Sequence, residues 1–191
     1  MATTERGQPA ARWQHWVEER PVAALLLVSF IATQLGTYFG YVFPAIGLPT
    51  LPWPLYNGQL AAPATTLNGA GEFVWGTSGQ FFVGQALHFV NGIVFGVLFG
   101  VLFRELLGWK RTNRGNIAMG LTYGLVMTII SAGLLVPYAY VPKQGYGLFV
   151  FSGPDGWKLP AGILVWHLIY GLFLGLLYQP RDRALEPRAA A

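Results

Sequence analysis

Two histidines lie inside long apolar stretches of the sequence, and each begins the same pattern. The segment from His88 is H-F-V-N-G-I-V-F-G-V-L-F and that from His167 is H-L-I-Y-G-L-F-L-G-L-L-Y, so both fit H-x3-G-x3-G-x2-[F/Y]. Steps of four residues place the histidine and its two glycines on one face of a helix. Neutral imidazole is an axial ligand of tetrapyrrole metals. The chemistry that this pattern could support is therefore the binding of haem b or a (bacterio)chlorophyll, with these histidines as the metal ligands.

Other roles are open to the same two histidines. A bis-histidine haem needs both side chains, whereas a chlorophyll magnesium needs only one. Ionisable side chains within a membrane usually face the bundle interior, so each imidazole could instead form a hydrogen bond between helices. The candidate partners are Asn91, Gln85, Thr128, Ser131 or a neighbouring carbonyl group. A contact with a quinone or with another metal is the third alternative.

Pairs of glycines four residues apart occur in all four of the apolar stretches. The first stretch has Gly36 and Gly40, and the six glycines of the other three are Gly92 and Gly96, Gly120 and Gly124, and Gly171 and Gly175. Helices in lipid associate through small residues that let their backbones approach closely. We therefore predict that these six glycines are helix-packing residues, and that the histidine-bearing ridges could also leave space for a flat cofactor.

The elements that carry these residues are four long apolar stretches, at about 22–43, 81–103, 117–138 and 159–178. Hydrophobic residues make up 53% of the 191 residues and charged residues only 10%, against about 25% charged in soluble domains. Each stretch has about the 20 residues that a helix needs to cross a bilayer. The sequence predicts an all-α membrane protein, a four-transmembrane-helix bundle with a transmembrane domain at 21–179.

The positive residues predict the orientation of this bundle. Ten of the twelve Lys and Arg residues would share one side of the membrane. They are Arg6, Arg12, Arg20, Arg104, Lys110, Arg111, Arg114, Arg181, Arg183 and Arg188. Only Lys143 and Lys158 would lie on the other side. Because positive residues concentrate in cytoplasmic loops, we expect a multi-pass protein of the cell (inner) membrane with both termini in the cytoplasm (N-in, C-in).

Two cytoplasmic segments would flank the transmembrane domain. Residues 1–20 contain Trp13, Trp16 and Val17 at helical spacing, which predicts a short interfacial helix over Ala10–Arg20. Residues 180–191 form a charged tail that ends in three alanines.

The two outer loops, 44–80 and 141–158, are rich in Pro, Gly and aromatic residues and poor in charge. Their aromatic and large apolar residues include Leu51, Trp53, Leu55, Tyr56, Phe73, Trp75, Tyr146, Phe149, Phe151 and Trp157. We consider two interpretations, an aromatic belt at the lipid interface and a surface that docks another subunit. The first loop is interpreted as a non-helical connection.

The order of the spans also predicts how the histidines are placed. The second and fourth spans both start on the outer side, and each histidine lies about 12 Å from the outer end of its helix at 1.5 Å per residue. The two imidazoles should then lie at one level and could face each other. The short connection between the second and third spans predicts that these two are antiparallel neighbours.

Several classes of function are excluded by what the spans lack. No Asp, Glu, Lys or Arg lies inside them, which argues against an ion or proton relay. The chain has no cysteine and lacks the zinc-protease and phosphate-loop motifs. The basic residues flank helices and would face anionic lipid headgroups, so no nucleic-acid partner is expected. We expect the protein not to be an enzyme.

The H-x3-G-x3-G pattern that starts at His88 and at His167 resembles one found in small bacterial and archaeal four-helix membrane proteins. It also resembles the way in which helices of cytochrome b subunits present axial histidines. Each resemblance covers two of the four spans. A cytochrome b561-type protein would use more transmembrane histidines than the two present here, which excludes a two-haem protein.

The sequence therefore leads to one expected function and its alternatives. We expect a non-catalytic integral subunit of a larger respiratory or photosynthetic membrane complex, which could ligate haem or chlorophyll through its transmembrane histidines. Its partners would be the lipid bilayer and other membrane subunits, contacted through the outer loops and helix faces. The alternatives are a stand-alone lipid- or quinone-binding membrane protein, and a pure structural scaffold.

Overall fold

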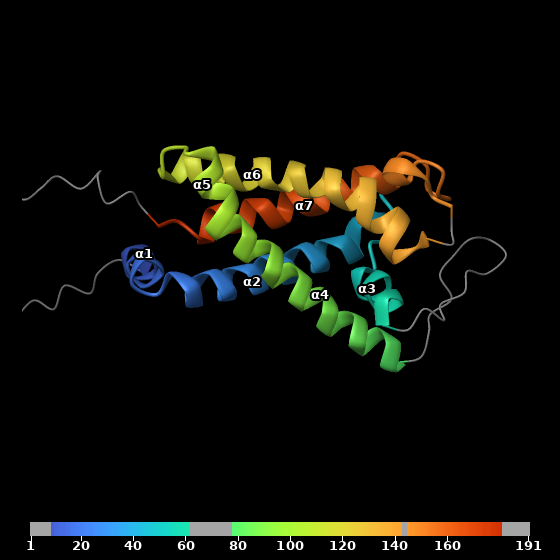
Figure 1. The fold of residues 1–191 in the computed structure, drawn as a ribbon, viewed down its shortest axis with the longest axis horizontal. Helices are drawn as coiled ribbons and strands as arrows, with labels where there is room; N and C mark the ends of the chain where they lie inside the picture. Colours follow the sequence, from blue (N-terminus) through green and yellow to red (C-terminus); the bar gives the residue numbers. More distant parts are fainter. Residues whose placement is uncertain (1–8, 62–77, 143–144, 181–191) are drawn as a thin grey trace, which may run out of the picture.

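A computed structural model describes residues 9–61, 78–142 and 145–180, and within these ranges the chain is helical without strands (Figure 1). The α-helices are α1 (Pro9–Glu19), α2 (Pro21–Val42), α3 (Trp53–Ala61), α4 (Ser78–Leu98), α5 (Arg104–Leu107), α6 (Asn113–Ile130) and α7 (Lys158–Leu177). The π-helices η2 (Phe99–Phe103) and η3 (Ser131–Tyr140) continue α4 and α6, and η1 (Phe43–Ile46) and η5 (Leu148–Val150) are short 3-10 turns.

Four helical segments are long and apolar enough to cross a membrane, and they form the predicted bundle. They cover Pro21–Ile46, Phe81–Leu107, Asn113–Tyr140 and Lys158–Leu177. The prediction of four spans is confirmed, with each helix placed within a few residues of its expected position. The termini end of the bundle carries α1, α5 and the end of α7, and the opposite, aromatic end carries α3, η5 and the start of α7 (Figure 1).

The closest packing in the bundle joins α6 to α7 through the predicted glycine pairs. A Cβ added to Gly120 would overlap with the carbonyl oxygen of Gly171, and one added to Gly171 would overlap with that of Gly120. A Cβ on Gly124 would lie 2.5 Å from the carbonyl oxygen of His167. The two backbones are therefore in direct contact, and only glycine fits at these positions.

Replacement of Gly171 by alanine should destabilise the bundle, because the added methyl group meets backbone rather than a flexible side chain. We expect Gly171→Ala to lower the free energy of unfolding by about 1–3 kcal/mol, measured by thermal unfolding in detergent. Gly162→Ala is the matched control on the same helix, since its Cβ would lie 3.7 Å from the nearest atom, in the Leu51 side chain. Equal losses in the two variants would contradict the proposed contact.

A second glycine ridge, on α4, packs against hydroxyl side chains of α2. Ser29 and Thr33 are buried, and each donates a hydrogen bond to the carbonyl group four residues earlier, at 2.6 and 2.7 Å. A Cβ on Gly96 would overlap with the Ser29 hydroxyl, and one on Gly92 with the Thr33 hydroxyl. Ser29 and Thr33 therefore pack between α2 and α4, with their hydroxyl protons bound within α2.

The first outer loop contains a helix, which corrects its interpretation as a non-helical connection. α3 begins beside Pro52 and Pro54, and proline is favoured in the first turn of a helix because its missing N–H has no partner there. Gly58 of α3 meets Gly84 of α4 so closely that a Cβ on Gly84 would lie 2.7 Å from the Gly58 nitrogen. The loop thus folds back into the bundle.

The aromatic residues of this loop belong largely to the core. Leu51, Trp53, Leu55 and Tyr56 are all buried, so neither a lipid-facing belt nor a docking surface describes them. The second outer loop divides: Tyr146 and Val150 are buried, whereas Phe151 and Trp157 are exposed. Phe73 and Trp75 lie outside the described residues.

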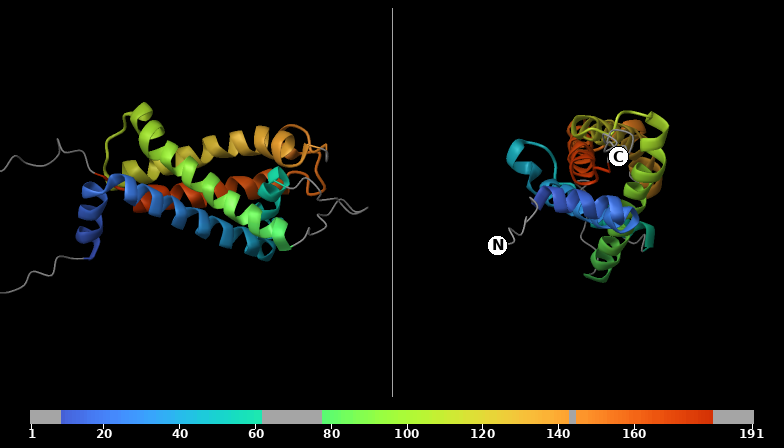
Figure 2. Two further views of the ribbon diagram at one scale, coloured as in Figure 1. Left: turned by 60° about the horizontal axis from the view of Figure 1, so that its bottom comes forward. Right: turned by 90° about the vertical axis from the view of Figure 1, so that its left-hand side faces the viewer.

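The second and third spans are neighbours over the halves next to the turn that joins them. α6 packs on α7 and touches the second span at η2 and, through the Tyr123 hydroxyl, at Phe95 of α4, whereas α4 packs mainly on α2 and α3. Both views show α4 crossing the bundle obliquely and moving away from α6 and η3 toward the aromatic end (Figures 1 and 2). The expectation of paired antiparallel spans therefore fails over their outer halves, where α3 lies between α4 and η3.

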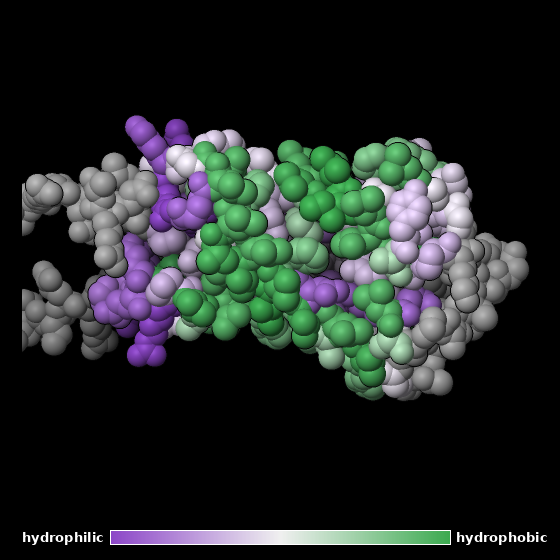
Figure 3. Space-filling view, in the orientation of Figure 1, coloured by the Kyte–Doolittle hydropathy of each residue, from purple (hydrophilic) through white to green (hydrophobic). Residues whose placement is uncertain are grey.

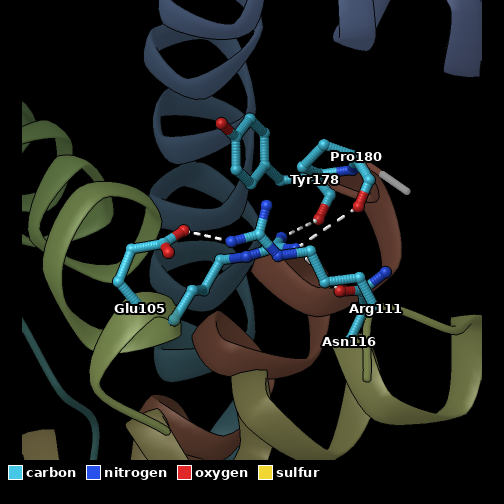
Figure 4. Close-up of polar contacts among 6 residues, drawn as sticks. Glu105, Arg111, Asn116, Tyr178 and Pro180 are labelled. Carbon is cyan, nitrogen blue, oxygen red and sulfur yellow. Dashed lines mark hydrogen bonds and ion pairs between the residues drawn. The ribbon is translucent and has the colours of Figure 1, made fainter. Parts of the chain in front are cut away.

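Arg104 joins three helices at the termini end. Its buried guanidinium donates hydrogen bonds to the Tyr178 carbonyl group and to Asn116 Oδ1, both at 2.9 Å, and lies 5.1 Å from the centre of the Tyr178 ring. Figure 4 shows Asn116 and Tyr178 gathered there, with Glu105 and Arg111 paired beside them. Arg104 is therefore a structural link as well as one of the positive residues of this end.

The predicted N-terminal helix is present as α1. It runs across the end of the bundle rather than along it (Figure 2). Trp13 Nε1 donates a hydrogen bond to the Leu177 carbonyl group at 2.8 Å, and Val17 is buried. This hydrogen bond satisfies one of the carbonyl groups that the end of α7 would otherwise leave unpaired. Its position at a membrane surface stays a prediction.

Candidate functional site

His88 is held between two helices by hydrogen bonds to both of its ring nitrogens. Nε2 lies 2.7 Å from the Thr37 hydroxyl of α2, and that hydroxyl donates its single proton to the Thr33 carbonyl group at 2.8 Å. Nδ1 faces the amide nitrogen of Asn57 of α3 at 3.5 Å. Because Asn57 Nδ2 is a donor, Nδ1 accepts and Nε2 carries the proton that is donated to Thr37.

The amide of Asn57 connects this histidine to the rest of the polar cluster. Its Nδ2 also donates to the Trp53 carbonyl group at 2.9 Å, and its Oδ1 accepts from Asn91 Nδ2 at 2.5 Å. Asn91 Nδ2 is 3.4 Å from the Tyr140 hydroxyl of η3. The polar groups of α3, α4 and η3 therefore meet in one network inside the bundle.

His167 has the opposite arrangement of its ring nitrogens. Its Nδ1 lies 2.8 Å from the Ile163 carbonyl oxygen of the same helix. A carbonyl oxygen only accepts, so Nδ1 carries the proton and Nε2 keeps its lone pair. Within the part of the chain that the structure describes, no group donates a hydrogen bond to Nε2, although the residue is only 6% exposed.

Two indole rings stand between and beside the histidines. The Trp53 ring stacks on His88 with centroids 6.4 Å apart and meets His167 edge-on at 6.1 Å. Trp166 contacts the same two imidazoles at 5.8 and 5.0 Å. Both histidines therefore lie at one level, as the sequence predicted, but they flank Trp53 rather than face each other across an open space.

The polar cluster borders a small cavity that opens on the side of the bundle, in the gap between α4 and η3. Its volume is about 40 Å³. Its polar and aromatic lining residues are Trp53, Asn57, His88, Asn91, Ser131, Tyr140 and His167. Figure 3 shows hydrophilic residues at this hollow, in the middle of an otherwise hydrophobic surface. No Lys, Arg, Asp or Glu lines it.

These dimensions bear on the predicted tetrapyrrole. Ligand pockets of drug-sized molecules have volumes of about 300–1,000 Å³, far above the 40 Å³ present here. His88 Nε2 is already bound to Thr37, and Trp53 occupies the space between the imidazoles. A macrocycle held by both histidines would have to displace that indole, so the described arrangement does not fit one. Among the described residues, no group of three His, Asp or Glu side chains could hold a bare metal ion.

Sequence reasoning identified the two histidines but not the groups that complete their surroundings. Asn91 and Ser131 were among the expected partners of a histidine; Asn91 joins the network and Ser131 lines the cavity. Trp53 and Asn57 were missed because they lie in a loop whose helix was not predicted. The Pro-Trp-Pro segment that precedes L-Y-N-G-Q-L is the signal that could have indicated it.

No protein-family model, no curated protein and no solved structure matches the chain.

The hydrogen bonds predict different tautomers for the two buried imidazoles. We expect His88 in the Nε2–H form and His167 in the Nδ1–H form, because their fixed partners are a donor amide and an acceptor carbonyl. Nitrogen-15 NMR of histidine-labelled protein distinguishes the forms, with signals assigned from His88→Phe and His167→Phe. The same tautomer at both positions would contradict the network.

Proposed function

We propose that this chain is a membrane protein that binds the polar head of a small amphiphile, of the lipid or quinone class, in the cavity between α4 and η3. One observation carries the proposal: hydrogen-bonding groups gather in a hollow on the side of an apolar bundle, a side that would face the bilayer. The head would enter the cavity while the tail stays among the lipids. In keeping with the distribution of Lys and Arg, both termini would be cytoplasmic.

Buried polar groups support this proposal because leaving them unpaired is costly. A polar group in an apolar environment without a partner costs roughly 1–3 kcal/mol in proteins. Among the cavity-lining residues, Trp53 has a buried indole Nε1 without a hydrogen-bond partner in the described ranges. His167 Nε2 and the hydroxyl protons of Ser131 and Tyr140 also have no partner there, and these residues line the same cavity. A bound head group, or water in its absence, would satisfy them.

Filling the cavity should abolish binding. Leu135 lines the cavity, so we expect Leu135→Trp to close it. Leu134→Trp is the matched control, because the neighbouring Leu134 is 58% exposed on the outer surface. Mass spectrometry of lipids that co-purify from membranes should show one amphiphile enriched with the wild type and with Leu134→Trp, and lost from Leu135→Trp. Identical lipid profiles for all three proteins would refute the proposal.

A second candidate is the subunit of a larger membrane assembly, and the exposure of the second span favours it. Only 22% of its most apolar window is buried inside the chain, compared with 44–50% for the other three spans. Its exposed residues include Phe82, Val83, Val90, Val94, Leu98, Val101 and Leu102. Such a face would be covered either by lipid or by another membrane helix.

Membranes solubilised in a mild detergent would test this second candidate. We expect a subunit to migrate in a discrete complex well above its own 20.9 kDa, as measured by native electrophoresis and light scattering. A variant with Val90 and Val94 changed to tryptophan should release it, whereas Leu134→Trp should not. A monodisperse monomer from native membranes would contradict the subunit role.

A further inference from the structure

We infer that the head group taken by this cavity is an uncharged aliphatic hydroxyl, so that the ligand is a neutral lipid alcohol; this inference rests on the proposed amphiphile binding. Three observations carry it: the hydrogen-bonding inventory of the walls, the absence of charge, and the volume of the cavity.

The cavity walls carry both hydrogen-bond acceptors and donors. Both nitrogens of His88 are engaged, by Thr37 and Asn57. His167 offers a lone pair on Nε2, because its proton is on Nδ1 and is donated to Ile163. The hydroxyl groups of Ser131 and Tyr140 can each donate a proton or accept one. Of the other lining residues, Trp53 has a buried indole Nε1–H without a partner, and Asn91 keeps its Oδ1 as an acceptor because only its Nδ2 is bonded. The walls thus present two acceptors, His167 Nε2 and Asn91 Oδ1, beside the indole N–H and two hydroxyl groups.

A hydroxyl group can serve both an acceptor and a donor of these walls with a single oxygen atom. Its proton would be donated to His167 Nε2, and its oxygen would accept from Tyr140 or Ser131. A ketone or ester carbonyl has no proton to donate, so it would leave the imidazole lone pair unpaired. A buried hydrogen-bonding group that is left without a partner costs more free energy than a well-formed hydrogen bond gains. A ligand without a hydroxyl proton is therefore disfavoured.

The absence of charge limits the ligand further. The cavity lining contains no Lys, Arg, Asp or Glu, and the buried Arg104 is occupied at the opposite end of the bundle by carbonyl and amide oxygens. A phosphate or carboxylate head would lose its hydration without gaining a counter-ion. Phospholipid heads are therefore disfavoured, although they dominate a bilayer.

The volume distinguishes an aliphatic alcohol from a quinol. A buried water needs a cavity volume of roughly 10–15 Å³, so a cavity of about 40 Å³ accommodates about three water-sized groups. A hydroxymethyl group with one further carbon fills it. The ring of a quinol is larger and would have to displace Trp53, which is held by stacking on His88 and by contact with Trp166.

Four defined probes test the inference on the wild-type protein in detergent micelles by native mass spectrometry. They are dioleoylglycerol, its acetate ester, dioleoyl phosphatidic acid and decylubiquinol. We expect dioleoylglycerol to bind about fivefold to tenfold more tightly than each of the others, the effect of one well-placed hydrogen bond. The ester retains the tails and glycerol body but lacks the hydroxyl proton, so it is the most direct comparison.

Variants connect the preference to the named atoms. We expect His167→Phe to abolish the preference for dioleoylglycerol over its ester, and His167→Gln to restore part of it through the side-chain oxygen. Tyr140→Phe should weaken the binding of dioleoylglycerol more than the binding of its acetate ester. His15→Phe is the control, because His15 lies on exposed α1 and pairs with Glu19. The comparison of the four probes on the wild-type protein tests the inference even if a variant does not fold.

The outcomes separate the two proposals. Equal binding of all four probes, lost in Leu135→Trp but not in Leu134→Trp, would retain amphiphile binding and overturn hydroxyl recognition. A preference for decylubiquinol or phosphatidic acid would overturn the ligand class in the same way. Binding that is unaffected by Leu135→Trp, or absent for every probe, would overturn the proposed site itself and the inference with it.

Discussion

α3 lies between α4 and η3, and the arrangement of the aromatic end follows from its position there. α3 can reach this position because Gly58 and Gly84 allow two backbones to touch. Once there, it keeps α4 apart from η3 and inserts Trp53 and Asn57 at the level of the histidines. The cavity remains because α3 fills only part of the gap between α4 and η3.

Two short hydrogen bonds from buried tyrosines fix the rotation of α4. The Tyr170 hydroxyl donates to the Gly92 carbonyl group and the Tyr123 hydroxyl to that of Phe95, both at 2.6 Å. These bonds reach α4 from the fourth and third spans, just before the π-helical turn η2, where the regular ladder of backbone hydrogen bonds is interrupted. They place His88 toward Thr37 and Asn91 toward the cavity.

The two copies of the histidine–glycine pattern have different roles. The copy in α4 packs its glycines on the hydroxyl groups of α2 and binds both nitrogens of His88, so it is structural. The copy in α7 packs Gly171 and Gly175 on the backbone of α6 and leaves one nitrogen of His167 unpaired. A ligand that needs both imidazoles, such as bis-histidine haem, is poorly matched to this asymmetry. A ligand that needs one acceptor beside a hydroxyl group is well matched to it.

The four spans, the glycine contacts between them and the common level of His88 and His167 follow from the sequence alone. These features depend on the length of apolar stretches and on periodicity within a single helix, which are local properties. The three-dimensional packing of the helices was needed to reveal that Trp53 separates the histidines, that Thr37 and Asn57 bind the two nitrogens of His88, and that α4 diverges from η3. Those contacts join residues tens of positions apart through a loop helix whose place is set by the bundle around it. The pattern of residues within one helix cannot predict these hydrogen-bond partners, because the partners depend on which helices come into contact.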